Sequence, residues 1–161
     1  MIDGYWLAVK RTDHRAFGLY KEHYSAKKNL PYRRVGNTNV AGSGETMTLL
    51  LQDGTALFVW IHNTVERLDK QIGVNCAVFR NDGRGSARVL SSELVTEADA
   101  LAWGKWPGMR LFTYVDPSQV RSVQVMGKAP GQCFLAAGWR PCGHSAKGQA
   151  ILEMLPEWTA P

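Results

Sequence analysis

"VFRNDGRGSA", residues 78–87, is where an apolar run ends and a polar, glycine-rich segment begins. The run "GVNCAVFRN" (73–81) predicts a strand, and a helix signal follows. Glycines let neighbouring backbone N–H groups turn toward one point, and a helix starting just afterwards adds the positive end of its dipole. The segment is therefore either a phosphate-binding loop or an ordinary polar turn between a strand and a helix.

The elements on either side complete a mixed α/β pattern. Asp53-Gly54 separates two β-type runs within residues 46–63 and predicts a hairpin, because both central turn positions favour positive φ. Ser91 or Ser92 is predicted to cap a helix that Pro107-Gly108 ends. Residues 25–45 are predicted as a long loop. Further strands are predicted over 5–9, 110–116, 139–144 and 148–155, and further helices after Thr12 or Asp13 and over 130–138.

Composition favours one globular domain over residues 1–161. The hydrophobic fraction is 45%, and no apolar run approaches the roughly 20 residues of a membrane span. The N-terminus lacks a signal-peptide pattern, so we expect a cytoplasmic protein and no membrane partner. The three cysteines show no metal-type spacing, so we expect reduced thiols and no metal site.

Positive charge is concentrated at the N-terminus. Residues 1–34 hold eight Lys and Arg against three Asp and Glu, an excess of five that equals the net charge of +5. Tyrosines alternate with these cations, a composition typical of a nucleic-acid site, where cations neutralise phosphates and aromatic rings stack on bases. The alternative is a solvated helix face. The residues expected to contact nucleic acid are Lys27, Lys28, Arg33 and Arg34.

Three motifs in order resemble the GNAT superfamily of CoA-dependent N-acyltransferases. They are the Asp53-Gly54 hairpin, the loop Arg80-x-x-Gly83-x-Gly85, and "CFLAAGWRPCG" (133–143). The likeness covers residues 45–155, with residues 1–44 as a basic segment on the acceptor side. It implies a mixed α/β GNAT-like single domain. That fold has a mostly antiparallel sheet of six to seven strands with a V-shaped splay, flanked by three or four helices.

The resemblance also implies a cofactor, acetyl-CoA or another acyl-CoA. Arg80, Gly83, Arg84 and Gly85 would bind its phosphates, and free backbone groups around Asn75, Ala77 and Val78 its pantetheine arm. Two features depart from the family pattern. The helix signal is strongest from Ser91 onward, several residues late. Phe134 stands where the family often has a tyrosine that protonates the leaving thiolate.

The catalytic candidates follow from these roles. Tyr114 or Cys133 would replace the missing acid, although Tyr114 fits a packed aromatic equally well. His62, Asp116 or His23, the last beside Tyr24, would serve as the base, although a single histidine also fits a hydrogen-bonded structural role. Ser91 and Ser92, at the expected helix start, would line the reaction centre.

These observations favour an atypical GNAT-like acyl or group transferase that acts on nucleic acid. "YKEHYS" (20–25) is similar to a short stretch of the phage Mom proteins, which modify DNA bases, and this suggests phage-encoded DNA modification. One alternative is a non-catalytic GNAT-fold module that binds nucleic acid or protein. Another is an ordinary acetyl-CoA-dependent N-acetyltransferase of a small molecule or protein.

Overall fold

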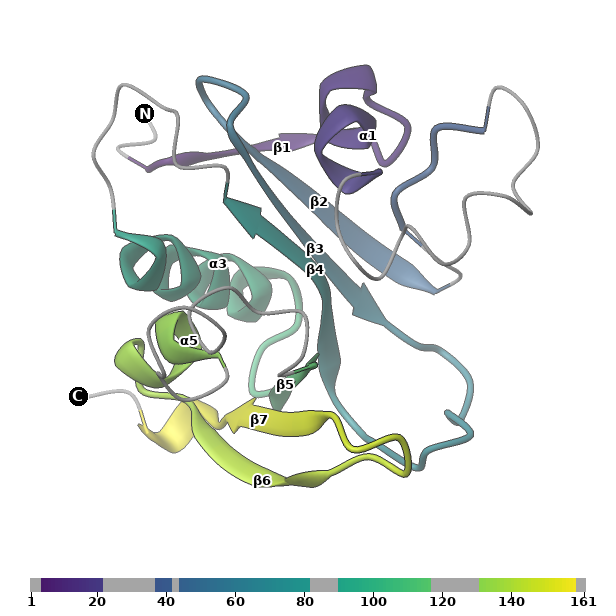
Figure 1. The fold of residues 1–161 in the computed structure, drawn as a ribbon, viewed down its shortest axis with the longest axis vertical. Coiled ribbons are helices and arrows are strands. Elements are labelled where there is room, and N and C mark those ends of the chain that lie inside the picture. The colour runs from purple at the N-terminus through teal and green to yellow at the C-terminus, as the bar shows by residue number, and fades with distance from the viewer. Residues whose placement is uncertain (1–3, 22–36, 42–43, 82–89, 117–130, 159–161) are drawn as a thin grey trace.

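A computed structural model describes residues 4–21, 37–41, 44–81, 90–116 and 131–158. Its centre is a seven-stranded sheet with the strand order β1-β2-β3-β4-β5-β7-β6 (Figure 1). Neighbouring strands are antiparallel except β4 and β5, which are parallel. The strands are β1 (Trp6–Val9), β2 (Glu45–Leu51), β3 (Ala56–His62), β4 (Val74–Asn81), β5 (Leu111–Val115), β6 (Arg140–His144) and β7 (Ala150–Met154).

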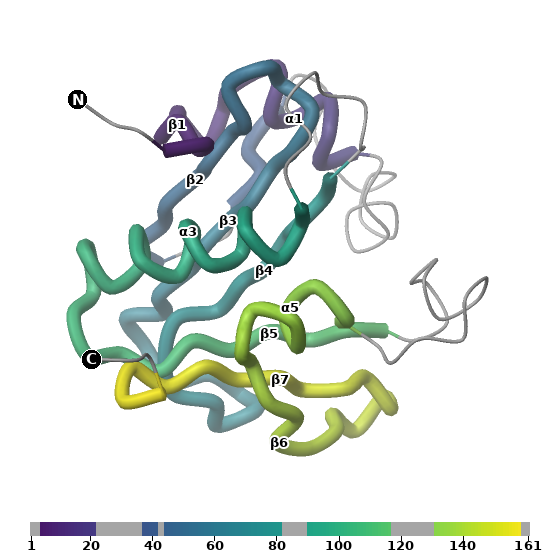
Figure 2. The backbone as a smooth tube through the Cα atoms, turned by 90° about the vertical axis from the view of Figure 1, so that its left-hand side faces the viewer, coloured from purple at the N-terminus to yellow at the C-terminus, as the bar shows by residue number. Residues whose placement is uncertain are grey.

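Helices lie on both faces of this sheet. Helices α3 (Ser91–Lys105) and α5 (Gln132–Ala136) lie together over one face, and α1 (His14–Tyr20) packs on the other (Figures 1 and 2). A single 3-10 turn, Pro156–Trp158, follows β7. The mixed α/β fold with a mostly antiparallel sheet of six to seven strands is therefore confirmed.

The sheet separates two hydrophobic cores. Phe58 and Trp60 of β3 belong to the core under α3, whereas Leu57 and Val59 belong to the core under α1. All four side chains are fully buried, because a central strand with both faces covered has no solvent side. Alternate residues of β3 therefore face opposite cores, and each residue paired with them on β2 or β4 faces the same core as its partner.

The predicted hairpin forms at Asp53-Gly54. Gly54 has a φ of 78°, and its N–H donates to the carbonyl of Leu51 at 2.7 Å. The Asp53 carboxylate accepts hydrogen bonds from the backbone N–H and the hydroxyl of Thr55, at 3.1 and 2.6 Å. This local bonding fixes the turn that places β2 against β3.

Helix α3 begins at Ser91, as the late helix signal indicated. The prediction that Ser91 or Ser92 is its N-cap is wrong, because Leu90 occupies that position in an extended conformation and offers no capping side chain. The Ser91 oxygen instead accepts a hydrogen bond of 3.0 Å from the side-chain amide of Asn81. Nearly two turns further on, the Glu97 carboxylate accepts the backbone N–H groups of Tyr5 and Trp6 at the start of β1.

No helix in the described part of the chain is long and apolar enough to cross a membrane. Within the same residues, no group of three or more His, Cys, Asp or Glu side chains is arranged to hold a metal ion.

Candidate functional site

Strands β4 and β5 separate soon after they begin to pair. Beyond the last pair, β4 continues for five residues to Asn81 and β5 for two to Val115. Figure 2 shows β4 running upward with β1–β3 while β5 stays beside β7. This is the V-shaped splay that the resemblance to the GNAT superfamily implied. The three pairs are Val74 with Leu111, Asn75 with Phe112, and Cys76 with Thr113.

A bulge in β4 accounts for the separation. Opposite β3, Val78 pairs with Val59 and Cys76 with Trp60, so Ala77 is an extra residue without a partner on β3. Bulges bend the strand that carries them and increase its twist. Consecutive residues Ala77 and Val78 both pack toward the core under α1, as an inserted residue requires. The bend therefore begins one residue beyond the last pair with β5.

Where β4 and β5 separate, some backbone N–H and C=O groups of β4 are already hydrogen-bonded and others have no partner on β5 in the described chain. Asn75 still pairs with β5, so its backbone is not among the free groups that the sequence led us to expect. The carbonyl of Cys76 accepts a hydrogen bond of 2.9 Å from the Thr113 hydroxyl. Within the described chain, the edges of Ala77 and Val78 that face the gap have no strand partner on β5.

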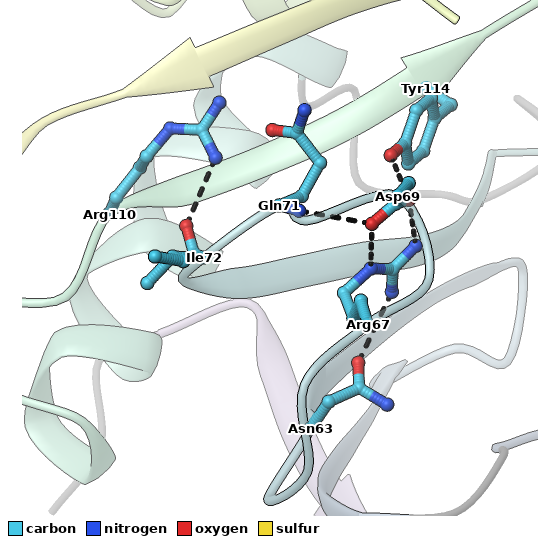
Figure 3. Close-up of polar contacts among 7 residues, drawn as sticks. All are labelled: Asn63, Arg67, Asp69, Gln71, Ile72, Arg110 and Tyr114. Atoms are coloured by element: carbon cyan, nitrogen blue, oxygen red, sulfur yellow. Dashed lines mark hydrogen bonds and ion pairs between the residues drawn. The ribbon is translucent and has the colours of Figure 1, made fainter. Parts of the chain in front are cut away.

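The 63–73 loop, which joins β3 to β4, covers β5 on the face opposite α3 (Figure 3). The Arg67 guanidinium lies 5.3 Å from the ring centre of Phe112 and 5.9 Å from that of Tyr114. Its Nε and one terminal nitrogen donate to the two oxygens of Asp69 at 2.9 and 2.7 Å. This bidentate ion pair holds the loop over the aromatic face of β5.

Asp69 is the centre of this network. Besides Arg67, its carboxylate accepts the Tyr114 hydroxyl and the backbone N–H of Gln71, the latter at 3.1 Å. The Arg67 hydrogen bonds hold the pKa of Asp69 well below its usual range. Burial, together with the bond to Asp69, raises the pKa of Tyr114 to about 12. We call Arg67, Asp69 and Tyr114 the loop network; at neutral pH its carboxylate is ionised and its phenol is protonated.

A pocket of about 550 Å³ lies beside the loop network. Tyr114 is the first residue of β5 beyond the last pair with β4, so it stands at the edge of the gap and also lines the pocket. The pocket and the gap are therefore adjacent. The lining residues are Arg67, Asp69 and Gln71 from the loop, Tyr114 and Ile151 from β5 and β7, and His144, Ser145, Ala146, Lys147 and Gln149 from the β6–β7 hairpin.

The paired end of β4 and β5 is closed by tight backbone contact. The N–H of Val74 donates to the carbonyl of Arg110 at 2.8 Å. Gly73 has a φ of 131°, and a Cβ there would lie 2.2 Å from the same carbonyl oxygen. The Arg110 guanidinium binds Glu153 and the carbonyl of Ile72, at 2.6 and 3.0 Å. Glycine at residue 73 is therefore what lets the two strands meet.

His62 does not join Tyr114. It follows the same alternation as Phe58 and Trp60 and so faces α3, whereas the loop network lies on the other face of the sheet. Its Nδ1 lies 3.0 Å from a carboxylate oxygen of Glu45, and its ring meets Trp106 edge-on at 6.0 Å.

The remaining described candidates lie at the far ends of the strands. Ser91 bonds to Asn81 at the end of β4, about 16 Å of strand beyond Cys76. It therefore does not lie beside Tyr114. Arg80 is half-buried near the same end, and Asp116 directly follows β5.

The other predicted residues lie outside the described part of the chain. They are His23, Tyr24, Lys27, Lys28, Arg33 and Arg34 in the basic segment, and Gly83, Arg84 and Gly85 in the glycine-rich loop.

Phe134 has a structural place. It is the buried residue of α5, and its ring centre lies 4.8 Å from that of Trp139 and 5.9 Å from that of Phe79. Burial raises the pKa of the neighbouring Cys133 thiol to about 11, and it also raises the pKa of Cys76 at the junction of the gap. Both thiols therefore keep their protons near neutral pH.

Sequence reasoning missed Arg67, Asp69 and Asp99. The first two lie in a polar loop, and their partner Tyr114 is more than 40 residues away, so no local pattern marks them. Asp99 is buried under α3 and accepts the indole N–H of Trp139 at 3.0 Å, and burial raises its pKa to about 8. The sequence feature that could have identified Asp99 is its position next to Ala98, which lies in the apolar stripe of the predicted helix.

Comparison with known proteins identifies this architecture. No family model matches the sequence, and no curated protein matches it. The structure is similar to aminoglycoside acetyltransferase AAC(6')-Ib in complex with coenzyme A and kanamycin, at 12% identity and a TM-score of 0.60 over 95% of this chain and 96% of the other. The chain has the GNAT fold.

A second relative of the GNAT fold is similar over most of its length. An acyl-CoA N-acyltransferase from Pseudomonas aeruginosa is 14% identical, with a TM-score of 0.55 over 92% of this chain and 96% of the other. AAC(6')-Ib has also been solved with paromomycin and acetyl-CoA, and that structure has a TM-score of 0.60 and 12% identity over 96% of both chains.

Proposed function

We propose that the protein is an acyl-CoA-dependent N-acyltransferase that holds its cofactor between β4 and β5. The observation that carries the proposal is the separation of these strands after Cys76 and Thr113, which opens a gap beside a pocket. The structures of AAC(6')-Ib with coenzyme A and with acetyl-CoA, which share this fold, support it.

The residues at the gap fit an extended amide-containing arm. Ala77 and Val78 present backbone edges without a strand partner on β5 in the described chain, and such edges bind amides as a neighbouring strand would. Arg80 lies near the end of β4, three residues before Gly83 in the sequence, and Gly83 and Gly85 are the glycines predicted to bind the phosphates. When bound, the cofactor supplies an acyl group activated as a thioester.

We assign Tyr114 to orienting the acceptor amine. Its hydroxyl hydrogen points to Asp69 and its pKa is about 12, so it does not release that proton at neutral pH. The phenolic oxygen still has lone pairs that can accept an N–H of the amine, and this would turn the nitrogen lone pair toward the gap. This role replaces the proton donation expected of Tyr114.

The charge of the N-terminal sequence and the size of the pocket favour different acceptors. A nucleic-acid acceptor and a phage origin stay predictions, based on the basic segment with Lys27, Lys28, Arg33 and Arg34. The pocket of about 550 Å³ is of a size that suits a small molecule, and it favours the ordinary N-acetyltransferase reading. A non-catalytic binding module is the remaining alternative.

Isothermal titration tests the proposal. We expect coenzyme A and acetyl-CoA each to give a saturable heat, and acetyl-CoA with a suitable amine to release free thiol. No heat at millimolar cofactor would contradict the proposed function. Mass spectrometry of nucleosides from DNA co-expressed with the protein tests the nucleic-acid acceptor, for which a modified nucleoside is expected.

A further inference from the structure

We propose that the pocket between the 63–73 loop and the β6–β7 hairpin selects a small amine that carries an anionic group over a polyamine. The inference rests on the proposed function, because it names the acceptor class of the same reaction. Its basis is the charge and the hydrogen-bonding capacity that the lining residues leave available.

The first step is that Asp69 has no capacity left for a substrate amine. A carboxylate has about four lone-pair positions, and those of Asp69 receive two hydrogen bonds from Arg67, one from Tyr114 and one from the Gln71 N–H. An ammonium group could bind this carboxylate only by displacing one of these donors. The only carboxylate among the lining residues is therefore already used within the protein.

The second step concerns Arg67, whose charge is already paired with Asp69 and three of whose five N–H groups donate within the protein. Two of its nitrogens bind Asp69, and a third donates to the side-chain oxygen of Asn63 at 3.2 Å. The ion pair of Arg67 and Asp69 adds no net charge to the pocket. Lys147 is the remaining Lys, Arg, Asp or Glu among the lining residues, so their formal charge is +1. A positive pocket repels a polyamine and attracts an anion.

The third step is that the hairpin presents a second donor beside Lys147. The Ser145 oxygen accepts the backbone N–H groups of Lys147 and Gln149 at 3.3 and 3.1 Å. A serine hydroxyl that accepts two hydrogen bonds still has its own hydrogen to donate. The backbone around it is fixed by bonds from Ser145 N–H to the Gln149 carbonyl and from Gly148 N–H to the Ser145 carbonyl. Ser145 and the exposed Lys147 would bind the anionic group.

These groups divide the pocket into two ends. Tyr114, at the edge of the gap, offers oxygen lone pairs to an amine, and the hairpin offers a cation and a hydroxyl to an anion. The acceptor is then a small molecule with a primary amine at one end and a carboxylate or a phosphate at the other. A molecule with amines at both ends finds no free carboxylate among the lining residues.

Binding of three matched probes tests the inference without cofactor. The probes are 4-aminobutyrate, 3-aminopropylphosphonate and 1,4-diaminobutane, followed through the backbone amide NMR signals of Ser145, Lys147 and Gln149. We expect saturable shifts with at least one of the two anionic probes and much weaker binding of the diamine. The stronger anionic probe indicates whether the natural acceptor carries a carboxylate or a phosphate. Diamine binding as tight as that of the better anionic probe, or no shift with either anionic probe at millimolar concentration, would overturn the inference.

Charge reversal supplies the second test. Lys147→Glu should weaken binding of the anionic probe about tenfold, the size of one charge-assisted hydrogen bond, and should improve binding of the diamine. Lys10→Glu, an equal charge change at an exposed residue outside the pocket, should leave both affinities unchanged. An unchanged probe preference in Lys147→Glu would overturn the inference. Anion-selective shifts together with no cofactor binding would instead contradict the proposed function alone.

Discussion

Asp69 is the side chain on which the loop over β5 depends, because it accepts hydrogen bonds from both Arg67 and Tyr114. Its pKa is lower in the folded protein than in the unfolded chain. The stability that it contributes is therefore fully present above its unfolded pKa of about 4 and is lost as the pH falls toward the folded value.

We expect Asp69→Asn to lower the free energy of unfolding at pH 7 by about 1 kcal/mol, a modest value because the carboxylate is 37% exposed. The variant should also lose less stability than the parent between pH 4 and pH 2. Urea unfolding at these pH values provides the measurement. Glu66→Gln, in an exposed ion pair with Lys70 on the same loop, is the matched control and should change stability little. Equal effects of the two substitutions would contradict the central place of Asp69.

Tyr114 should lose its proton only at high pH. Burial and Asp69 raise its pKa to about 12, against about 10 in the unfolded chain, so its stabilising contribution is present below pH 10 and is lost as the pH rises toward 12. An ultraviolet titration of the five tyrosines should lose its highest transition in Tyr114→Phe and keep it in Tyr20→Phe. A Tyr114→Phe titration curve that still contains the highest transition would assign it to another residue.

Asp99 has the opposite pH dependence to Asp69. Burial raises its pKa to about 8, so between its unfolded pKa of about 4 and pH 8 the protein takes up a proton on folding. Stability from this group is therefore greatest below pH 4 and falls as the pH rises to 8. Asp99→Asn should remove this fall, which urea unfolding at pH 5 and pH 8 would detect. Glu93→Gln, exposed on the same helix, should retain it.

At the level of elements, Gly73 sets the junction of β4 and β5. A Cβ at residue 73 would lie 2.2 Å from the Arg110 carbonyl oxygen, in a backbone conformation that L-residues rarely adopt. We expect Gly73→Ala to cost more than about 2 kcal/mol of stability in thermal or urea unfolding. Gly54→Ala, at a φ of 78° and with no atom within 4 Å of the added Cβ, should cost less, because both its backbone conformation and its surroundings are milder than those of Gly73.

The elements also show what the sequence can and cannot predict. The hairpin at Asp53-Gly54 and the start of α3 follow from neighbouring residues, and both were predicted. The bulge at Ala77 depends on how β3 and β4 align, and the loop network joins Asp69 to Tyr114 across more than 40 residues. Strand register and long-range contacts are set by tertiary packing, so no local pattern in the sequence identifies them.

For the same reason only part of the site could be predicted. Tyr114 was a candidate because its phenol, on the strand before residues 133–143, could replace the missing acid, and it does lie at the gap. His62 was chosen by its place along the chain, but strand alternation directs it to the opposite face. Ser91 was chosen because the expected helix start would line the reaction centre, but it binds Asn81 at the far end of β4.

For the molecule as a whole, the sheet consists of β1–β4 and of β5–β7, and the two parts are joined by the three residue pairs between β4 and β5. A cofactor between them would bind both. Because such a ligand binds the folded state alone, it should stabilise the protein by about 2.7 kcal/mol at a hundredfold excess over Kd. Unfolding midpoints measured at increasing coenzyme A concentration should rise accordingly, and a midpoint that is independent of coenzyme A would count against a cofactor in the gap.

The bond between Asn81 and Ser91 has a consequence for how this architecture can diversify. It fastens the last residue of β4 to the first residue of α3, so the two ends of their connection are fixed by the scaffold itself. A different sequence in place of residues 82–90 would therefore have to connect only two residues that already contact each other. We therefore expect substitutions within residues 82–89 to leave β4 and α3 in place.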